Sequence, residues 1–228
     1  MKLIAIINKL YTQKAKRKEA RKMAFKYYRD SLSGRLGLWS ALYNDGAVGK
    51  KIYYAVTDYV HGLSGRCGYC QDRIFHKKNS NIDHILPASI YPQFTFVDDN
   101  LVRVCVTCNM LKLAHDFYAL PAPLARYYDE YLGRWTCFHP RHQVFSQHVE
   151  RLVIQTNHLY FRAYLGKTPE GRKLCLSLLQ QVSEFELKAT ANPVVALAAQ
   201  KLGQYVQSRG NVNVGAVKKL LCTLVENV

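Results

Sequence analysis

Two Cys-x-x-Cys pairs constrain the fold of this chain more than any other feature of its sequence. The first pair is Cys67 and Cys70, and the second is Cys105 and Cys108. Four thiolates complete a tetrahedral shell around zinc, and a shell closed to water is structural. A short, loop-rich segment buries too little apolar area to hold itself together, so we expect the metal to replace a core there. The alternative is four buried free thiols.

The other cysteines indicate a reducing compartment. The chain has seven cysteines, and Cys137, Cys175 and Cys222 stand apart from the two pairs. An odd count with paired spacing favours zinc over a disulfide framework.

The apolar run from Leu3 to Ile7 is too short for a signal peptide, and no apolar stretch reaches the length of a membrane span. We therefore expect a cytoplasmic protein that does not enter a membrane.

Positive charge dominates the chain and gathers at its beginning. Lysine and arginine number 32 against 16 acidic residues, which gives a formal net charge of +16. An excess of this size indicates a polyanionic partner, although a merely soluble basic protein is the alternative. Residues 1–35 alone contain 11 cations and two anions. Such a block either lies along phosphates or is a solvated arm, and both interpretations stay open.

Hydrophobic periodicity predicts helices on both sides of a short two-stranded segment. Pro87 and Pro92 end the first strand candidate, and an Asp-Asp-Asn turn precedes the second. The predicted elements in chain order are helices over 10–32 and 47–62, strands over 81–86 and 101–106, and a helix over 108–117.

The sequence beyond residue 117 is less specific. Residues 146–165 fit either strand or helix, so their structure stays open. A helix should follow, with Thr168 as its N-cap and Pro169 as its first residue. Two more helices are predicted over about 192–202 and 214–225.

The chemistry between the cysteine pairs suits phosphodiester hydrolysis. That reaction needs a base to take a proton from water and a cation to neutralise charge on the phosphate and leaving oxygen. The imidazole of His84 fits the first role. The Asp83 carboxylate and the Asn109 amide oxygen suit a hard cation such as Mg²⁺ or Mn²⁺. Adjacent strand residues point to opposite sides, so a twisted or bulged strand end is needed for Asp83 and His84 to converge.

The order CGYC, IDHILP, NLVRVCVTCNMLK resembles the zinc-knuckle subgroup of the HNH endonucleases, which form the ββα-metal class. The similar stretch covers about 67–117. The resemblance implies a ββα-metal fold and hydrolysis of DNA to products with 5′-phosphate and 3′-hydroxyl ends. It also implies two metals, a structural zinc and a catalytic Mg²⁺ or Mn²⁺.

The resemblance also implies a role for each residue at a family position. His84 would be the general base, and Asp83 and Asn109 would bind the catalytic cation. Asn100 would tie down the loop that orients His84. Lys112 would contact the scissile phosphate, with an ordinary exposed helix lysine as the alternative. Many relatives have His where this chain has Asn109, so the site is an HNN variant.

Taken together, these features predict an α+β fold that is mostly helical. A ββα-metal HNH core with zinc knuckles should be flanked by N- and C-terminal helices. We expect a basic helical region over 1–62, the nuclease core over 63–120 and a mainly helical region over 121–228.

A second group of metal-capable side chains follows the core in the segment CFHPRHQVFSQH. Its two-residue steps are loose for zinc and its proline indicates a turn, so we favour a structural role over a metal site. This segment and GKTPEGRKLCLSLL are similar to segments of stand-alone bacterial HNH proteins, including nucleases of anti-phage systems such as Septu and Zorya. The group consists of Cys137, His139, His142 and His148.

The function that these features favour is a metal-dependent DNA endonuclease of a bacterial defence or restriction-type system. We expect such a nuclease to act with a partner that supplies target recognition, and an ATPase subunit is the leading candidate. Two alternatives stay open. One is a zinc-stabilised DNA-binding or adaptor protein with an inactive HNH site, and the other is an RNA nuclease.

Overall fold

The computed structural model divides the chain into two compact units, Met1–Trp135 and Thr136–Val228. The first unit includes both residue ranges, 1–62 and 63–120, that the sequence analysis treats as separate regions. The helices predicted over 192–202 and 214–225 lie outside the continuously described residues. The structure describes residues 13–120, 133–155 and 160–188 continuously. It also describes the single positions 8, 10, 128, 197, 201, 215, 216 and 219.

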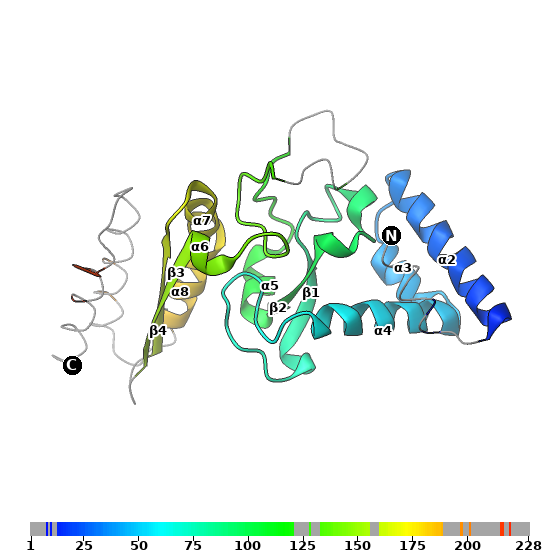
Figure 1. The fold of residues 1–228 in the computed structure, drawn as a ribbon, viewed down its shortest axis with the longest axis horizontal. Helices are drawn as coiled ribbons and strands as arrows, with labels where there is room; N and C mark the ends of the chain where they lie inside the picture. The colour runs from blue at the N-terminus through cyan, green and yellow to red at the C-terminus, as the bar shows by residue number, and fades with distance from the viewer. Residues whose placement is uncertain are drawn as a thin grey trace. The chain divides into compact units, whose positions relative to one another are not determined.

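Three helices come first in the continuously described part of this unit (Figure 1). They are α2 (Lys14–Leu32), α3 (Leu38–Asn44) and α4 (Gly46–Gly62). The two long helices match the predictions from hydrophobic periodicity. The sequence did not predict α3, because seven residues are too few to establish a helical period. Gly37, with a φ of 68°, makes the left-handed turn that starts it.

A continuous apolar core joins the three helices to the strands that follow. Each helix contributes one face, and the opposite faces carry the charged and polar residues. Because the core includes residues next to and within the second strand, the helices and the strands form one packed body. The buried members are Ala20, Ala24, Tyr27, Leu38, Leu42, Ile52, Val56, Val60, Phe96 and Leu101.

Two strands and a short helix follow, in the order that the sequence predicts. Strand β1 (Ser80–His84) pairs antiparallel with β2 (Leu101–Cys105), and α5 (Val106–Lys112) packs against both. Helix α5 stops earlier than predicted because Leu113 leaves the helical region with a φ of 47°. Three single-turn 3₁₀ helices flank the strands: η1 (Lys77–Asn79), η2 (Pro92–Phe94) and η3 (Asp98–Asn100).

The second unit contains a hairpin covered by a helical segment. The hairpin is the structure of the stretch for which the sequence allowed strand or helix. Thr168 caps the next helix by accepting from the Gly171 N–H at 3.2 Å, and Pro169 is its first residue, as predicted. The elements are α6 (Phe145–His148), β3 (Val149–Gln155), β4 (Tyr160–Gly166), α7 (Pro169–Leu174), the π-helical turn η5 (Cys175–Leu179) and α8 (Gln180–Lys188).

The described part of the chain therefore combines helices with two small antiparallel sheets. This confirms the coarse α+β class that the sequence predicts. None of the helices in that part has both the length and the apolar character that a membrane crossing requires.

Candidate metal centre and active site

The structure brings the four paired cysteines together. The sulfur atoms of Cys67, Cys70, Cys105 and Cys108 all lie within 4.8 Å of one another, and the Sγ atoms of Cys70 and Cys105 are 3.7 Å apart. A tetrahedral zinc with Zn–S bonds near 2.3 Å requires sulfurs about 3.8 Å apart. These four cysteines could therefore hold a metal ion such as zinc.

Local backbone structure explains why the two pairs converge. Cys67 lies in a tight turn, where its N–H donates to the Asp72 carbonyl at 2.8 Å and its carbonyl accepts from the Gln71 N–H at 3.0 Å. The second pair lies where β2 becomes α5, and Cys105 Sγ accepts from the Cys108 N–H at 3.4 Å as the N-cap of that helix. The cluster therefore joins a turn, a strand end and a helix start.

The thiols perturb one another strongly. Hydrogen bonds from the Cys108, Cys67 and Cys70 thiols lower the pKa of Cys105. The contact with Cys105 is the largest cause that raises the pKa values of Cys70 and Cys108 well above the usual range. Four sulfurs at this separation cannot all be thiolates without a cation between them, so the cluster has the electrostatics of a metal site.

Asp83 lies near the end of β1 and is anchored through one oxygen. Its Oδ2 atom accepts from the Tyr69 hydroxyl at 3.0 Å and pairs with the Lys112 ammonium at 3.0 Å. Tyr69 is fully buried between the first two cysteines, so the metal cluster and the carboxylate are directly linked. Among the residues that the structure describes, Oδ1 has no polar partner and can bind a cation.

His84 is held in one tautomer. A carbonyl oxygen only accepts, so the contact of 3.0 Å between His84 Nε2 and the Thr95 oxygen requires a proton on Nε2. The Nδ1 lone pair then has no partner in the described part of the chain. Burial lowers the pKa of His84, although the bond to Thr95 and the charge of Asp83 oppose that effect. The imidazole is therefore neutral near pH 7, as a general base must be.

Asn100 closes the loop between the strands. The residue is fully buried, and its amide nitrogen donates to the carbonyls of Leu86 at 3.1 Å and Phe94 at 3.2 Å. Its amide oxygen accepts from the Leu86 N–H at 2.7 Å. The clamped loop carries Thr95, the partner of His84. Asn100 thus lies where the sequence resemblance places a loop-fixing residue.

Replacement of Asn100 with alanine is expected to destabilise the protein by about 3 kcal/mol. Three buried hydrogen bonds disappear, and the Leu86 N–H is left without a partner. Urea unfolding measures the loss. The matched control is Asn79→Ala, at an exposed position in η1, which should change stability by less than about 0.5 kcal/mol. Equal stability of the two variants would contradict a clamping role.

Asn109 lies in the first turns of α5 and is partly buried. Its side-chain amide has no polar partner within the described ranges. Lys112 follows three residues later, on the same side of the helix, and reaches Asp83 on β1. The side of α5 that carries Asn109 therefore faces the carboxylate, where an amide oxygen can complete a cation site with Asp83.

Lys112 is buried, whereas the sequence led us to expect a phosphate contact or an exposed helix lysine. Its side chain is 1% exposed, and its ammonium donates to the His84 carbonyl at 2.9 Å as well as pairing with Asp83. The residue is thus neither an ordinary surface lysine nor an open phosphate contact. It is an internal counterion that ties α5 to the end of β1.

Of the twisted or bulged strand end that the sequence led us to expect, the bulge is absent from β1. Antiparallel pairing continues regularly through Asp83↔Val102 and His84↔Leu101. The side chain of Asp83 faces α5, whereas that of His84 faces α3 and the loop before β2. The two side chains therefore lie on opposite sides of the strand end.

Sequence reasoning missed Tyr69 and Arg103. Arg103 is a buried cation at the centre of β2, flanked on both sides by apolar residues, and that apolar context was its only signal. The guanidinium ties the end of α4, the first knuckle and β1 together. Its acceptors are Ser80 Oγ at 3.2 Å and the carbonyls of His61 at 3.3 Å, Ser64 at 3.0 Å and Ile74 at 3.4 Å.

The second group of metal-capable residues does not assemble into a cluster. In the described ranges, the paired cysteines form the one group of three or more such side chains close enough to share a metal ion. His148 Nδ1 instead contacts Thr168 Oγ1 at 2.8 Å, and burial lowers the pKa of His139 to about 2. The structural role that we favoured for this segment agrees with these contacts. His115, which follows α5 in the chain, is exposed.

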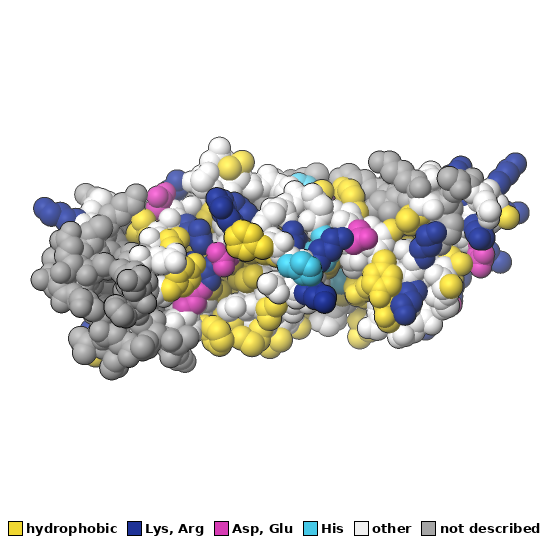
Figure 2. All heavy atoms as spheres, turned by 90° about the horizontal axis from the view of Figure 1, so that it is seen from below, with side chains coloured by type: hydrophobic (Ala, Val, Ile, Leu, Met, Phe, Trp, Pro, Cys, Tyr) yellow, Lys and Arg dark blue, Asp and Glu magenta, His cyan; other side chains and the backbone are white. Residues whose placement is uncertain are grey.

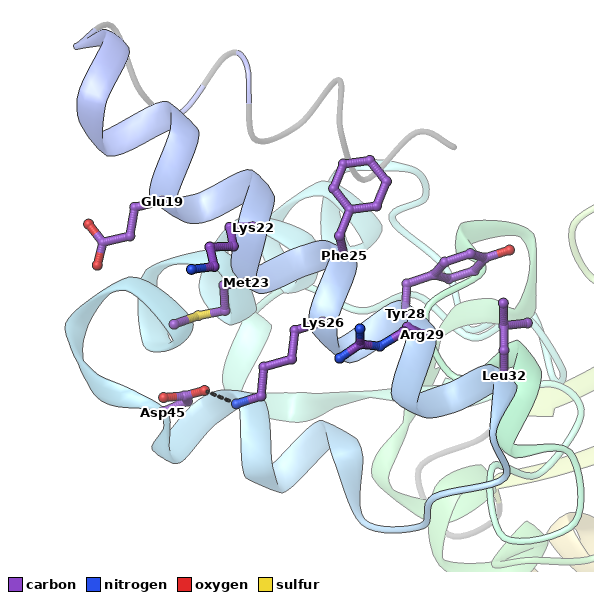
Figure 3. Close-up of a pocket in the computed structure, with 9 residues that line it drawn as sticks. All are labelled: Glu19, Lys22, Met23, Phe25, Lys26, Tyr28, Arg29, Leu32 and Asp45. Carbon is purple, nitrogen blue, oxygen red and sulfur yellow. Dashed lines mark hydrogen bonds and ion pairs between the residues drawn. The ribbon is translucent and has the colours of Figure 1, made fainter.

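Helix α2 has an exposed face that carries cations. A pocket of about 770 Å³ lies beside α2, and Lys22, Lys26 and Arg29 contribute to its lining with Phe25 (Figure 3). The Lys26 ammonium is paired with an aspartate at the start of α4, at 3.3 Å. The remaining cations on this face suit contact with phosphates.

Comparisons with protein-family models, with curated proteins and with solved structures find no match to this chain.

Proposed function

We propose that this protein is a metal-dependent endonuclease that hydrolyses phosphodiester bonds in DNA through an HNH site. One observation carries the proposal. His84 Nδ1, Asp83 Oδ1 and the Asn109 amide are without partners in the described part of the chain, while Thr95 orients His84, and Tyr69 and Lys112 orient Asp83. A proton acceptor and two oxygen ligands for a cation are the chemical minimum for this reaction.

Each residue of the site has its own role in the proposed hydrolysis. His84 Nδ1 takes a proton from the attacking water, while its Nε2–H stays on the Thr95 carbonyl and keeps the ring in place. Asp83 and Asn109 would hold Mg²⁺ or Mn²⁺, which neutralises charge on the phosphate and on the leaving 3′ oxygen when bound. Asn100 fixes the loop, and Lys112 fixes the carboxylate.

The remaining features support a nucleic-acid substrate. Zinc on the four cysteines would join the knuckles without taking part in chemistry, because its shell is closed. The exposed cations of α2 and the net charge of +16 would attract a polyanion. A target-recognition partner such as an ATPase subunit fits the same proposal, since the described site has groups for chemistry and none for reading sequence.

Replacement of His84 with alanine is expected to reduce DNA cleavage by a factor of about 10²–10⁴ or more, because the proton acceptor is lost. Supercoiled plasmid incubated with Mg²⁺ reports nicking and linearisation. The matched control is His115→Ala, which removes an exposed histidine close in sequence to α5 and should cleave like the wild type.

Two measurements make that test decisive. Zinc content and the circular dichroism spectrum should be unchanged in His84→Ala, which separates loss of chemistry from loss of fold. Undiminished cleavage by this variant would contradict the assignment. Binding of DNA without cleavage by the wild type would instead favour an adaptor, and cleavage of RNA alone would redirect the substrate.

A further inference from the structure

A row of aromatic rings starts at His84 and crosses the outer surface of α3 and α4. The ring centroid of Trp39 lies 5.8 Å from that of His84 and 5.0 Å from that of Tyr53. Tyr53 lies 5.0 Å from Tyr43, which lies 5.9 Å from Tyr54. The rings therefore form a continuous path from the proposed general base, and we call Trp39, Tyr43, Tyr53 and Tyr54 the aromatic row.

The three tyrosines of the aromatic row lie outside the apolar core, whereas Trp39 also packs against it, with its ring centroid 5.9 Å from that of the core residue Phe96. In α3 the core face carries Leu38 and Leu42, whereas Trp39 and Tyr43 follow them on an adjacent face at a spacing of four residues. Three of the rings are partly exposed, and Tyr54 is 49% exposed. Core packing therefore accounts for Trp39 but not for the three tyrosines on this surface.

A lysine lies beside the aromatic row, and the acidic residue of α4 is paired with another lysine. The Lys50 ammonium lies 4.9 Å from the ring centroid of Tyr43. Asp58, the acidic residue within α4, is paired with Lys77 at 2.6 Å. Seen from below, Lys and Arg side chains lie next to hydrophobic ones over the region that α4 occupies (Figure 2). This surface is therefore aromatic and cationic.

We propose that the aromatic row binds a single-stranded stretch of nucleic acid and leads it to His84. Unpaired bases have free π-faces that stack on Tyr and Trp, and a neighbouring lysine balances the phosphates. Bases in a duplex already stack on each other and present only their edges in the grooves. The inference rests on the proposed nuclease function and narrows its substrate to DNA with an unpaired segment beside the cut.

The test measures binding without cleavage. A fluorescein-labelled oligothymidine and a duplex of the same length are titrated with protein in the absence of added divalent cation, and anisotropy gives Kd. Tyr54→Ala should weaken single-strand binding by about 5- to 150-fold, and Tyr54→Phe should retain it because the ring remains. The matched control is Phe75→Ala, at a ring that is 88% exposed and outside the row, which should bind like the wild type.

Each outcome either supports or overturns the inference. Loss of single-strand binding in Tyr54→Ala alone, with an unchanged circular dichroism spectrum, supports it. Equal affinities of Tyr54→Ala and wild type overturn it, as does a wild-type preference for the duplex. Binding does not require catalysis. If the wild type binds single strands through the aromatic row but cannot cut DNA, the nuclease proposal fails while the inference about the aromatic row stands.

Discussion

Replacement of Cys105 with serine is expected to abolish stoichiometric zinc binding and to lower the melting temperature by about 10 °C or more. Structural zinc sites contribute apparent binding free energies of about 10–16 kcal/mol, whereas whole domains are stable by only about 5–15 kcal/mol. Loss of one ligand forfeits a large part of that contribution. Cys105 is also both the last residue of β2 and the cap of α5, so the strand and the helix lose their common anchor.

A second cysteine provides the matched control. Cys175 is a buried thiol in the other compact unit, and burial raises its pKa to about 12. Cys175→Ser should lower stability modestly but leave zinc content unchanged. Zinc released by a thiol-modifying reagent, read with a colorimetric chelator, measures the metal, and calorimetry measures the melting temperature. Full zinc content in Cys105→Ser would show that the four-cysteine cluster is not the metal site.

The features predicted correctly are those that depend on short-range pattern. The spacing of the cysteines predicted which four side chains lie together, because two Cys-x-x-Cys pairs are typical of a tetrahedral zinc site. The strands β1 and β2 begin and end within two residues of their predicted bounds, since an Asp-Asp-Asn turn and prolines mark them in the sequence. Thr168 followed by Pro169 likewise marks a helix start through local chemistry alone.

The features that the sequence did not reveal depend on contacts between distant segments. Whether Lys112 is exposed or buried depends on what the strand opposite α5 presents, and that strand is 28 residues earlier. The hydroxyl of Tyr69 matters only because Asp83 lies beside it. The aromatic row escaped notice because its members come from two helices, one of which is too short to recognise. Hydrophobic periodicity predicts which face of a helix or strand is buried, but not which other element that face packs against.

Replacement of Lys112 with methionine is expected to destabilise the protein by about 3–5 kcal/mol. The variant keeps the length and volume of the side chain but removes the cation, which leaves the Asp83 carboxylate, 13% exposed, with the Tyr69 hydroxyl as its remaining anchor. The His84 carbonyl loses its donor at the same time. Urea unfolding measures the loss. Lys78→Met, at an exposed lysine before β1, is the matched control and should change stability by less than about 0.5 kcal/mol.

A double-mutant cycle isolates the pair itself. Asp83→Asn alone leaves the Lys112 ammonium buried without its counterion, so it should also destabilise strongly. The Asp83→Asn/Lys112→Met protein lacks both charges and should lose clearly less stability than the two single changes combined. Additive losses would mean that the two groups do not interact in solution, and the anchoring role of Lys112 would have to be abandoned.

Divalent cations connect this stability test to the proposed chemistry. If Asp83 binds Mg²⁺, the cation should stabilise Lys112→Met more than the wild type, because it meets a carboxylate that no longer has an internal counterion. The gain should grow with Mg²⁺ concentration as RT ln(1 + [Mg²⁺]/Kd) and vanish in Asp83→Asn. If Mg²⁺ changes the stability of none of the three proteins (wild type, Lys112→Met and Asp83→Asn), Asp83 is not a ligand of the proposed catalytic cation, and the role of the four-cysteine cluster is unaffected. The Asp83–Lys112 pair therefore serves as an internal reporter of whether a second metal binds beside His84.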